Sequence, residues 1–321
     1  MIVVLWTDAL VWLLFALLAG YAFYVRRHEH LLTPWRRVGR SASGTAAAVV
    51  IGALSVVALA DSLHHRPRLE TSDPAKPAYG VEVLSVLDLA LAPLRARSER
   101  TYSAPFATRL YQRETVDLGD GRVRREFPRL RHGGAHLQDE ADRNADVAMR
   151  GLGGAAAGLV AWLLAALGAA VFVARRQGVP LSQARRRMMA QEGTANWPAI
   201  LYTLLPIALL AGAAANLATH YHVLGTDKVG QDVLYLSLKS VRTAYVIGAL
   251  TALVMLPLAV VLGISAGYFR GWIDDAIQYV YTTINSIPGV LLIAAVVLMM
   301  QAYIDRYPEL FPRSEESRGG K

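Results

Sequence analysis

Long uninterrupted apolar runs are the feature that most constrains this chain. An apolar stretch of about 18 or more residues is a candidate to cross a bilayer. The bilayer interior offers backbone groups no water, so only helices and closed barrels cross it, and runs without apolar/polar alternation favour helices. The sequence therefore predicts an all-α polytopic membrane protein with about six transmembrane helices and excludes a soluble enzyme. The runs cover residues 2–25, 45–60, 152–174, 197–218, 243–268 and 277–303.

The segment between the second and third runs differs from the rest of the chain. Residues 61–150 carry nearly equal numbers of basic and acidic residues and contain no long apolar run. This composition predicts an external, water-facing (periplasmic) domain of about 90 residues with mixed or irregular structure. Within it, Gly119-Asp120-Gly121 indicates a hairpin turn. Residues Asp139 to Met149 indicate a helix that leads into the membrane.

Two short loops hold the positive charge of the chain. Residues 26–44 and 175–196 each contain five arginines and one glutamate, which together account for the net charge of +8. Because Arg and Lys mark cytoplasmic loops, we expect both loops inside a bacterial inner membrane, with residues 61–150 and 219–242 outside. The charge thus indicates the lipid bilayer as a partner. It does not indicate nucleic acid, since no basic surface interleaved with aromatic residues is present in the sequence.

No segment of the sequence carries a pattern for catalysis, a cofactor or a metal. The chain has no cysteine, and the terminal Gly319-Gly320-Lys321 lacks the rest of a phosphate-binding loop. The histidine pairs are too loosely spaced for a metal site, and we expect them to face solvent or the membrane interface. Asp8 is expected at headgroup level. The sequence therefore predicts a non-enzyme. The pairs are His64 and His65, His132 and His136, and His220 and His222.

Small residues recur at a spacing of four in two of the apolar runs. Gly154 and Gly158 stand in the third run, and Gly263 and Gly267 stand in the fifth. This spacing lets two helices approach closely in lipid. For the third run, an ordinary Ala-rich span explains the same residues equally well. In the sixth run, Pro288 is expected to bend the first turns of a helix.

Residues 220–289 are the most patterned part of the chain. They combine residue types that suit tight turns with types that cap helices. The pattern indicates an outer turn, a closely packed helix and an inner turn. The first group of residues is His222, Leu224, Gly225, Thr226, Asp227, Gly230, Asp232, Val233 and Leu234; the second is Ala266, Gly267, Tyr268, Gly271, Trp272, Asp274 and Pro288.

These residues resemble the permease subunit of bacterial ABC importers for dipeptides, oligopeptides and nickel. That family shows H-P-L-G-T-D-x-x-G-R-D-V-L before a membrane helix and A-G-Y-x-G-G-W-x-D after it. The resemblance covers about residues 197–303, which would be the N-terminal part of the permease domain. It implies an alternating-access path for peptides or a related small solute. It also implies a second permease subunit, cytoplasmic ATPase subunits and an external substrate-binding protein as partners.

The sequence departs from the family pattern within the motifs and at its end. Val223 replaces a Pro, Gln231 an Arg, and Arg270 one Gly of the inner turn. The E-A-A…G loop that docks on the ATPase in the family, and the two further spans that come after it, are not found before Lys321. We therefore expect an incomplete permease, truncated before the docking loop.

The resemblance leaves the first 196 residues as an N-terminal extension. We expect two membrane helices in 1–60, the external domain in 61–150, a third helix with the second Arg-rich loop in 151–196, and a polar tail in 304–321. The extension also suits a second class of function, a membrane-anchored sensor or interaction protein that receives a signal through its external domain. The motif residues between 222 and 288 oppose that interpretation.

Overall fold

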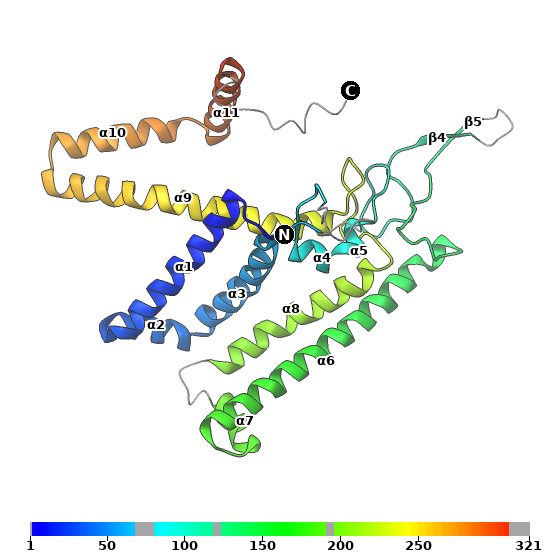
Figure 1. Ribbon diagram of the computed structural model, residues 1–321, viewed down its shortest axis with the longest axis horizontal. Helices are drawn as coiled ribbons and strands as arrows, with labels where there is room; N and C mark the ends of the chain where they lie inside the picture. The colour runs from blue at the N-terminus through cyan, green and yellow to red at the C-terminus, as the bar shows by residue number, and fades with distance from the viewer. Residues whose placement is uncertain (1, 68–79, 118–122, 191–195, 308–321) are drawn as a thin grey trace, which may run out of the picture. The chain divides into compact units, whose positions relative to one another are not determined.

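The computed structural model describes residues 2–67, 80–117, 123–190 and 196–307 (Figure 1). Its contacts divide into two units, Met1–Leu250 and Thr251–Lys321. Within the described ranges, six helices are long and apolar enough to cross a membrane, which confirms the predicted all-α polytopic fold. These helices cover Trp6–Arg27, Ala42–Ser62, Glu140–Gln177, Trp197–Ala218, Val233–Phe269 and Gly289–Arg306.

The first unit begins with three helices joined by short turns. They are α1 (Trp6–Arg27), α2 (Glu29–Arg40) and α3 (Ala42–Ser62). The hydroxyl of Ser41 accepts a hydrogen bond from the Gly44 backbone N–H at 3.1 Å and so caps the start of α3. The second run, predicted over 45–60, is therefore part of a longer helix of 21 residues.

A second group of helices follows later in the first unit. The short 3₁₀ helix η1 (Glu140–Asp142) leads into α6 (Arg143–Gln177), so the predicted helix from Asp139 continues directly into the third membrane-crossing candidate. After α7 (Leu181–Met189), the helix α8 (Trp197–Ala218) runs back beside α6 (Figure 1).

Both Arg-rich segments lie at one end of the helices of the first unit. The side-chain amide of Asn196, at the start of α8, donates to the backbone oxygen of Arg40 at the end of α2, with a distance of 3.1 Å. Figure 1 shows α2 and α7 at this end and α4 at the other. This arrangement is the one that the paired Arg-rich loops require if both lie on the same side of a membrane.

The segment between α3 and α6 is small and irregular. Two short strands of this segment, β2 (His64–His65) and β3 (Leu84–Ser85), form an antiparallel sheet with β1 (Ile2–Val3), in the order β1-β2-β3. The short helices α4 (Val86–Ala90) and α5 (Ala92–Arg95) follow β3. The strand β1 precedes α1 in the chain and forms one edge of this sheet.

A two-stranded hairpin extends from the same segment. β4 (Glu114–Asp117) and β5 (Val123–Glu126) pair antiparallel, with Glu114 opposite Glu126 and Asp117 opposite Val123. The predicted turn at Gly119-Asp120-Gly121 lies outside the described residues.

The helix α9 (Val233–Phe269) begins about ten residues earlier than the apolar run from 243 predicts. Its first part belongs to the first unit, where it packs on α1 and α3. The ring of Tyr245 stacks on Phe15 with centroids 6.1 Å apart, and its hydroxyl donates to the backbone oxygen of Ile51 at 3.0 Å. The polar residues at the start of α9 are therefore helical, not part of an external loop.

The second unit contains the rest of α9, then α10 (Trp272–Ser286) and α11 (Gly289–Arg306). The prediction of one bent helix over 277–303 is wrong, because the chain leaves the helical conformation at Ile287, whose ψ is 124°. A residue before proline is disfavoured in the α region by the ring of Pro288. The sixth membrane-crossing candidate is thus α11 alone.

Candidate functional site

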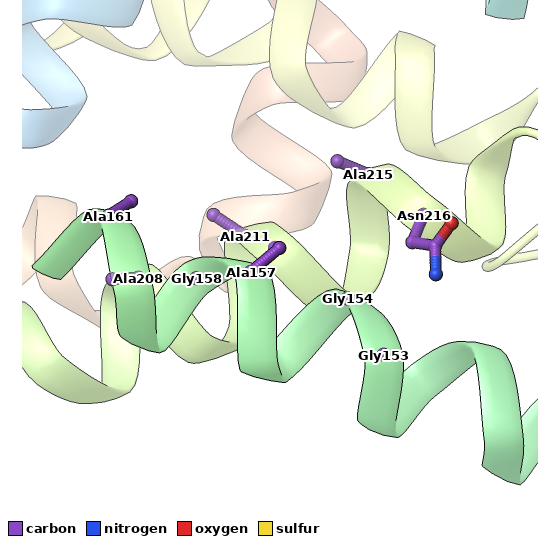
Figure 2. Close-up of a pocket in the computed structure, with 10 residues that line it drawn as sticks. Gly153, Gly154, Ala157, Gly158, Ala161, Ala208, Ala211, Ala215 and Asn216 are labelled. Carbon is purple, nitrogen blue, oxygen red and sulfur yellow. The ribbon is translucent and has the colours of Figure 1, made fainter.

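The closest helix packing in the first unit is between α6 and α8. A Cβ atom added at Gly158 would overlap the backbone oxygen of Ala208, and one at Gly154 would overlap that of Gly212 (Figure 2). Nearby, the indole N–H of Trp162 donates to the backbone oxygen of Leu201 at 2.9 Å. The sequence allowed either a close helix approach or an ordinary Ala-rich span for these residues, and the structure shows the close approach.

The outer turn of the motif, residues 222–232, packs against the segment that precedes β4. Gly225 and Gly230 have φ values of +77° and +81°, a region that favours glycine. A Cβ atom at Gly225 would overlap the backbone oxygen of Ser103, and one at Gly230 would overlap that of Glu99. Both positions thus require glycine, because φ is positive there and because the backbone of residues 99–103 leaves no room for a Cβ atom.

Hydrogen bonds join the outer turn to residues 99–106 along its length. The backbone N–H of Glu99 donates to the oxygen of Gly230 at 2.8 Å, and that of Phe106 donates to the oxygen of His222 at 3.0 Å. Between them, the hydroxyl of Thr226 donates to the oxygen of Thr101 at 2.8 Å. The extension and the motif therefore form one substructure in the first unit.

Two aspartates of the motif cap the outer turn and the start of α9. Asp227 Oδ1 accepts from the backbone N–H groups of Val229 and Gln231 at 2.9 and 2.8 Å. Asp232 Oδ1 accepts from the N–H of Leu234 at 2.8 Å, just inside α9. The capping that the sequence indicates is therefore present for both residues.

His222 is buried between two carboxylates, which corrects the expectation that it faces solvent. The residue is 1% exposed; Nδ1 lies 2.7 Å from Asp232 Oδ2 and Nε2 lies 3.4 Å from Glu99 Oε1. Glu99 also accepts from the backbone N–H groups of Arg131 and His132. We call Glu99, His222 and Asp232 the clasp, because they fasten the outer turn to the extension.

The clasp is an ionic arrangement at neutral pH. Burial acts to lower the pKa of His222, but the hydrogen bonds to Asp232 and Glu99 outweigh it and raise that pKa to about 9. Burial acts to raise the pKa of Glu99, but the bonds from His222 and two backbone amides lower it to about 2. The hydrogen bonds to the two carboxylates thus favour the protonated form of the His222 imidazole.

The clasp makes stability depend on pH. The folded pKa of His222 exceeds its ordinary value of 6.5, so its contribution is complete below about pH 6.5 and is lost as pH rises to about 9. We expect the gap in thermal unfolding midpoint between the wild type and His222→Gln to be widest near pH 6.5. The gap should shrink towards pH 9. A gap that is constant over this range would contradict a charged His222.

Gly230 allows a second test of the docked turn. Gly230→Ala places a methyl group into the backbone of Glu99 and forces an L-residue to hold φ near +81°. We expect a loss of about 2 kcal/mol or more of unfolding free energy. Gly248→Ala is the matched control, because no atom lies within 4 Å of its added Cβ. Chemical unfolding of both variants in detergent measures the difference.

A buried group of charges joins the start of α9 to the extension. We call Asp8, Asp61, Asp88, Lys239 and Arg242 the charge cluster; its three carboxylates are each at most 2% exposed. Lys239 Nζ lies 2.8 Å from Asp88 Oδ1, and Arg242 Nη2 lies 2.5 Å from Asp8 Oδ1. Asp61 lies between them, 3.8 Å from Lys239 Nζ and 3.9 Å from Arg242 Nη1.

Neutral side chains and a histidine complete the charge cluster. His64 Nδ1 lies 2.9 Å from Asp8 Oδ2, so this histidine is also buried instead of facing solvent. The hydroxyls of Ser85 and Tyr235 donate to Asp61 and Asp88 at 2.8 and 2.6 Å. Sequence reasoning missed the cluster, although the spacing of Lys239 and Arg242 places both cations on one face of a helix.

The inner-turn residues of the motif lie in the second unit. Gly263, Gly267 and Gly271 have open space where a Cβ would stand, and the side chains of Tyr268 and Trp272 are exposed. Close packing at Gly263 and Gly267 therefore stays a prediction. Two other motif residues begin helices: Asp274 stands in the first turn of α10, and Pro288 precedes α11.

Arg270 adopts a conformation that usually requires glycine. Its φ is +50°, and Gly271 follows with φ +62°. The resemblance places a Gly of the inner turn at Arg270, and this left-handed backbone conformation explains why the family has Gly there.

Among the described residues, no group of three or more His, Asp or Glu side chains is placed to hold a metal ion.

Part of the sequence is similar to permease proteins of peptide transport systems. Over 79 residues it is 35% identical to the glutathione transport system permease protein GsiD of Pectobacterium atrosepticum, covering 25% of this chain and 26% of that protein. Over 75 residues it is 35% identical to the oligopeptide transport system permease protein OppC of Mycobacterium tuberculosis, covering 23% and 26%. The same figures hold for OppC of Mycobacterium bovis.

The similarity confirms the resemblance to ABC importer permeases for a limited segment. The chain spans about a quarter of the length of the curated relatives that it matches. No family model matches the sequence, and no solved structure matches it. The relatives are components of transport systems, which is consistent with a chain that is not an enzyme.

Proposed function

We propose that this chain acts as a membrane permease component of an ABC importer that takes up peptides. The observation that carries the proposal is the 35% identity to permease proteins of glutathione and oligopeptide systems. The six membrane-crossing candidates suit such a role. In this proposal the chain performs no covalent chemistry and contributes helices to a path with two arrangements, one open to each side of an inner membrane.

The orientation and partners follow from the same proposal. The Arg-rich segments at α2 and α7 face the cytoplasm, where separate ATPase subunits supply the energy. A second permease subunit completes the path, and an external binding protein delivers the peptide to the side that carries the clasp. A conformational change then has to be favoured by contacts that differ between the two arrangements.

The clasp and the charge cluster give the extension a part in this function. Glu99 holds the outer turn, while Asp61 and Asp88 hold the first turns of α9. Both attachments lie on the same end of the first unit as β1–β3. The extension is therefore proposed to position the permease-like segment, which is a different role from receiving a signal as a separate sensor.

Peptide uptake by a deletion strain tests the function. We expect a strain without the gene to lose uptake of labelled tripeptides or glutathione, and a plasmid copy to restore it. Parallel uptake of a labelled sugar controls for general damage to the membrane. Unchanged uptake of both peptide classes in the deletion strain would contradict the proposal. Co-purification of tagged chain with an ATPase subunit would test the partners separately.

A further inference from the structure

A groove in the first unit lies away from the motif residues. It has a volume of about 380 Å³ and is formed where α6, α7 and α8 meet. Most of its lining is apolar, and it lies at the Arg-rich end of the helices. Its residues include Trp162, Ala166 and Ala170 of α6, Arg185 and Met188 of α7, and Leu201 of α8.

The walls of this groove are held in place by packing and hydrogen bonding. Ala184 and Met188 of α7 are buried against Ala170 and Val173 of α6. This packing fixes the short helix α7 on α6, so Arg185 is held at the groove and is not on a free loop. The indole of Trp162 also lines the groove, and its N–H donates a hydrogen bond to the backbone oxygen of Leu201.

The positive charge at the groove has no acidic partner within the described part of the chain. None of the ion pairs there involves Arg185 or its neighbours Arg186 and Arg187, which together form a dense positive charge on α7. A guanidinium binds phosphate in a planar, two-pronged geometry. A groove with apolar walls and such a group at its lining complements a molecule that has an apolar chain and an anionic head.

We propose that this groove binds one anionic phospholipid of the cytoplasmic leaflet. Its acyl chain lies in the groove along Trp162 and Leu201, and its phosphate contacts Arg185. A zwitterionic lipid fills the same groove less well, because its own ammonium group offsets the attraction to Arg185. The proposal requires only that the chain lies in a membrane, so it stands or falls independently of peptide transport.

Fluorescence quenching of Trp162 tests the proposal. The full chain is reconstituted in phosphatidylcholine vesicles that contain either brominated phosphatidylglycerol or brominated phosphatidylcholine, each over the same series of mole fractions. The difference between the wild type and Trp162→Phe isolates the signal of this indole. We expect quenching by the anionic lipid to need about fivefold less of it, the size expected for one arginine near a membrane surface.

Three variants separate a specific site from general attraction to the membrane. Arg185→Gln should make quenching of Trp162 by the two lipids equal. Arg176→Gln, which removes an exposed charge outside the groove, should keep the stronger quenching by the anionic lipid. Ala166→Leu, which fills the groove, should abolish quenching of Trp162 by both lipids. An unchanged preference in Arg185→Gln, or full quenching in Ala166→Leu, would overturn the proposal. So would displacement of the brominated lipid by inorganic phosphate at constant ionic strength.

Discussion

Gly158→Leu is expected to separate α6 from α8 and to cost about 3 kcal/mol of unfolding free energy. Even a methyl group at this position would overlap the backbone oxygen of Ala208, and a backbone atom cannot turn aside as a flexible side chain can. The two helices have to move apart along several turns. Helices in lipid associate through close packing, since lipid tails are as apolar as the side chains they would replace.

The comparison with Gly168→Leu makes this result specific. Gly168 lies on the same helix, but nothing stands within 4 Å of its added Cβ. The two variants carry the same side chain in the same membrane helix, so the difference between them reports the contact alone. Folded protein recovered from detergent and its thermal midpoint are the measurements. Equal midpoints for both variants would show that α6 and α8 are not in backbone contact.

Arg242→Met is expected to destabilise the first unit by about 3–5 kcal/mol, because it leaves buried carboxylates without a cation. Asp8 is 1% exposed and lies 2.5 Å from Arg242 Nη2, and Asp61 depends on the same guanidinium and on Lys239. The Met side chain replaces most of the apolar part of the Arg242 side chain. The loss of unfolding free energy therefore reflects the missing charge more than lost packing. Chemical unfolding in detergent measures it.

A second substitution distinguishes lost charge from lost shape. Asp8→Asn together with Arg242→Met should cost less than the sum of the two single variants, since the carboxylate that needed the cation is also removed. Lys228→Met is the matched control, because Lys228 is exposed on the outer turn and belongs to no buried pair among the described residues. Strict additivity would show that Asp8 and Arg242 do not depend on each other.

The membrane helices could be predicted because their stability in lipid depends on local composition. A run such as 197–218 satisfies its own backbone hydrogen bonds as a helix and needs no partner to do so. The ends of the helices depend on other parts of the chain. Lys239 and Arg242 look like loop residues in the sequence, but the carboxylates of the extension neutralise them and allow α9 to begin at Val233.

The clasp and the contact of Gly154 and Gly158 with α8 show why long-range contacts were harder to predict than the membrane helices. His222 has a carboxylate partner, Glu99, that is 123 residues away, and nothing in a charge pattern says which acid meets which base. Gly154 and Gly158 did carry a signal, and Ala208 and Gly212 repeat the same spacing on α8. Matching small residues on two neighbouring apolar runs are therefore the sequence signal that favours a close helix pair over an ordinary Ala-rich span.

The length of α6 has a mechanical consequence. Its 35 residues make a rod of about 52 Å, well beyond the roughly 30 Å thickness of the hydrocarbon layer. One end carries Asp146, whose carboxylate accepts from the hydroxyl of Tyr221 beside the clasp at 2.7 Å. The other end carries Ala170 on the groove that α6 forms with α7 and α8. If α6 tilts as a rigid helix, its two ends move together. The groove near one end and the outer turn near the other are therefore mechanically coupled through α6.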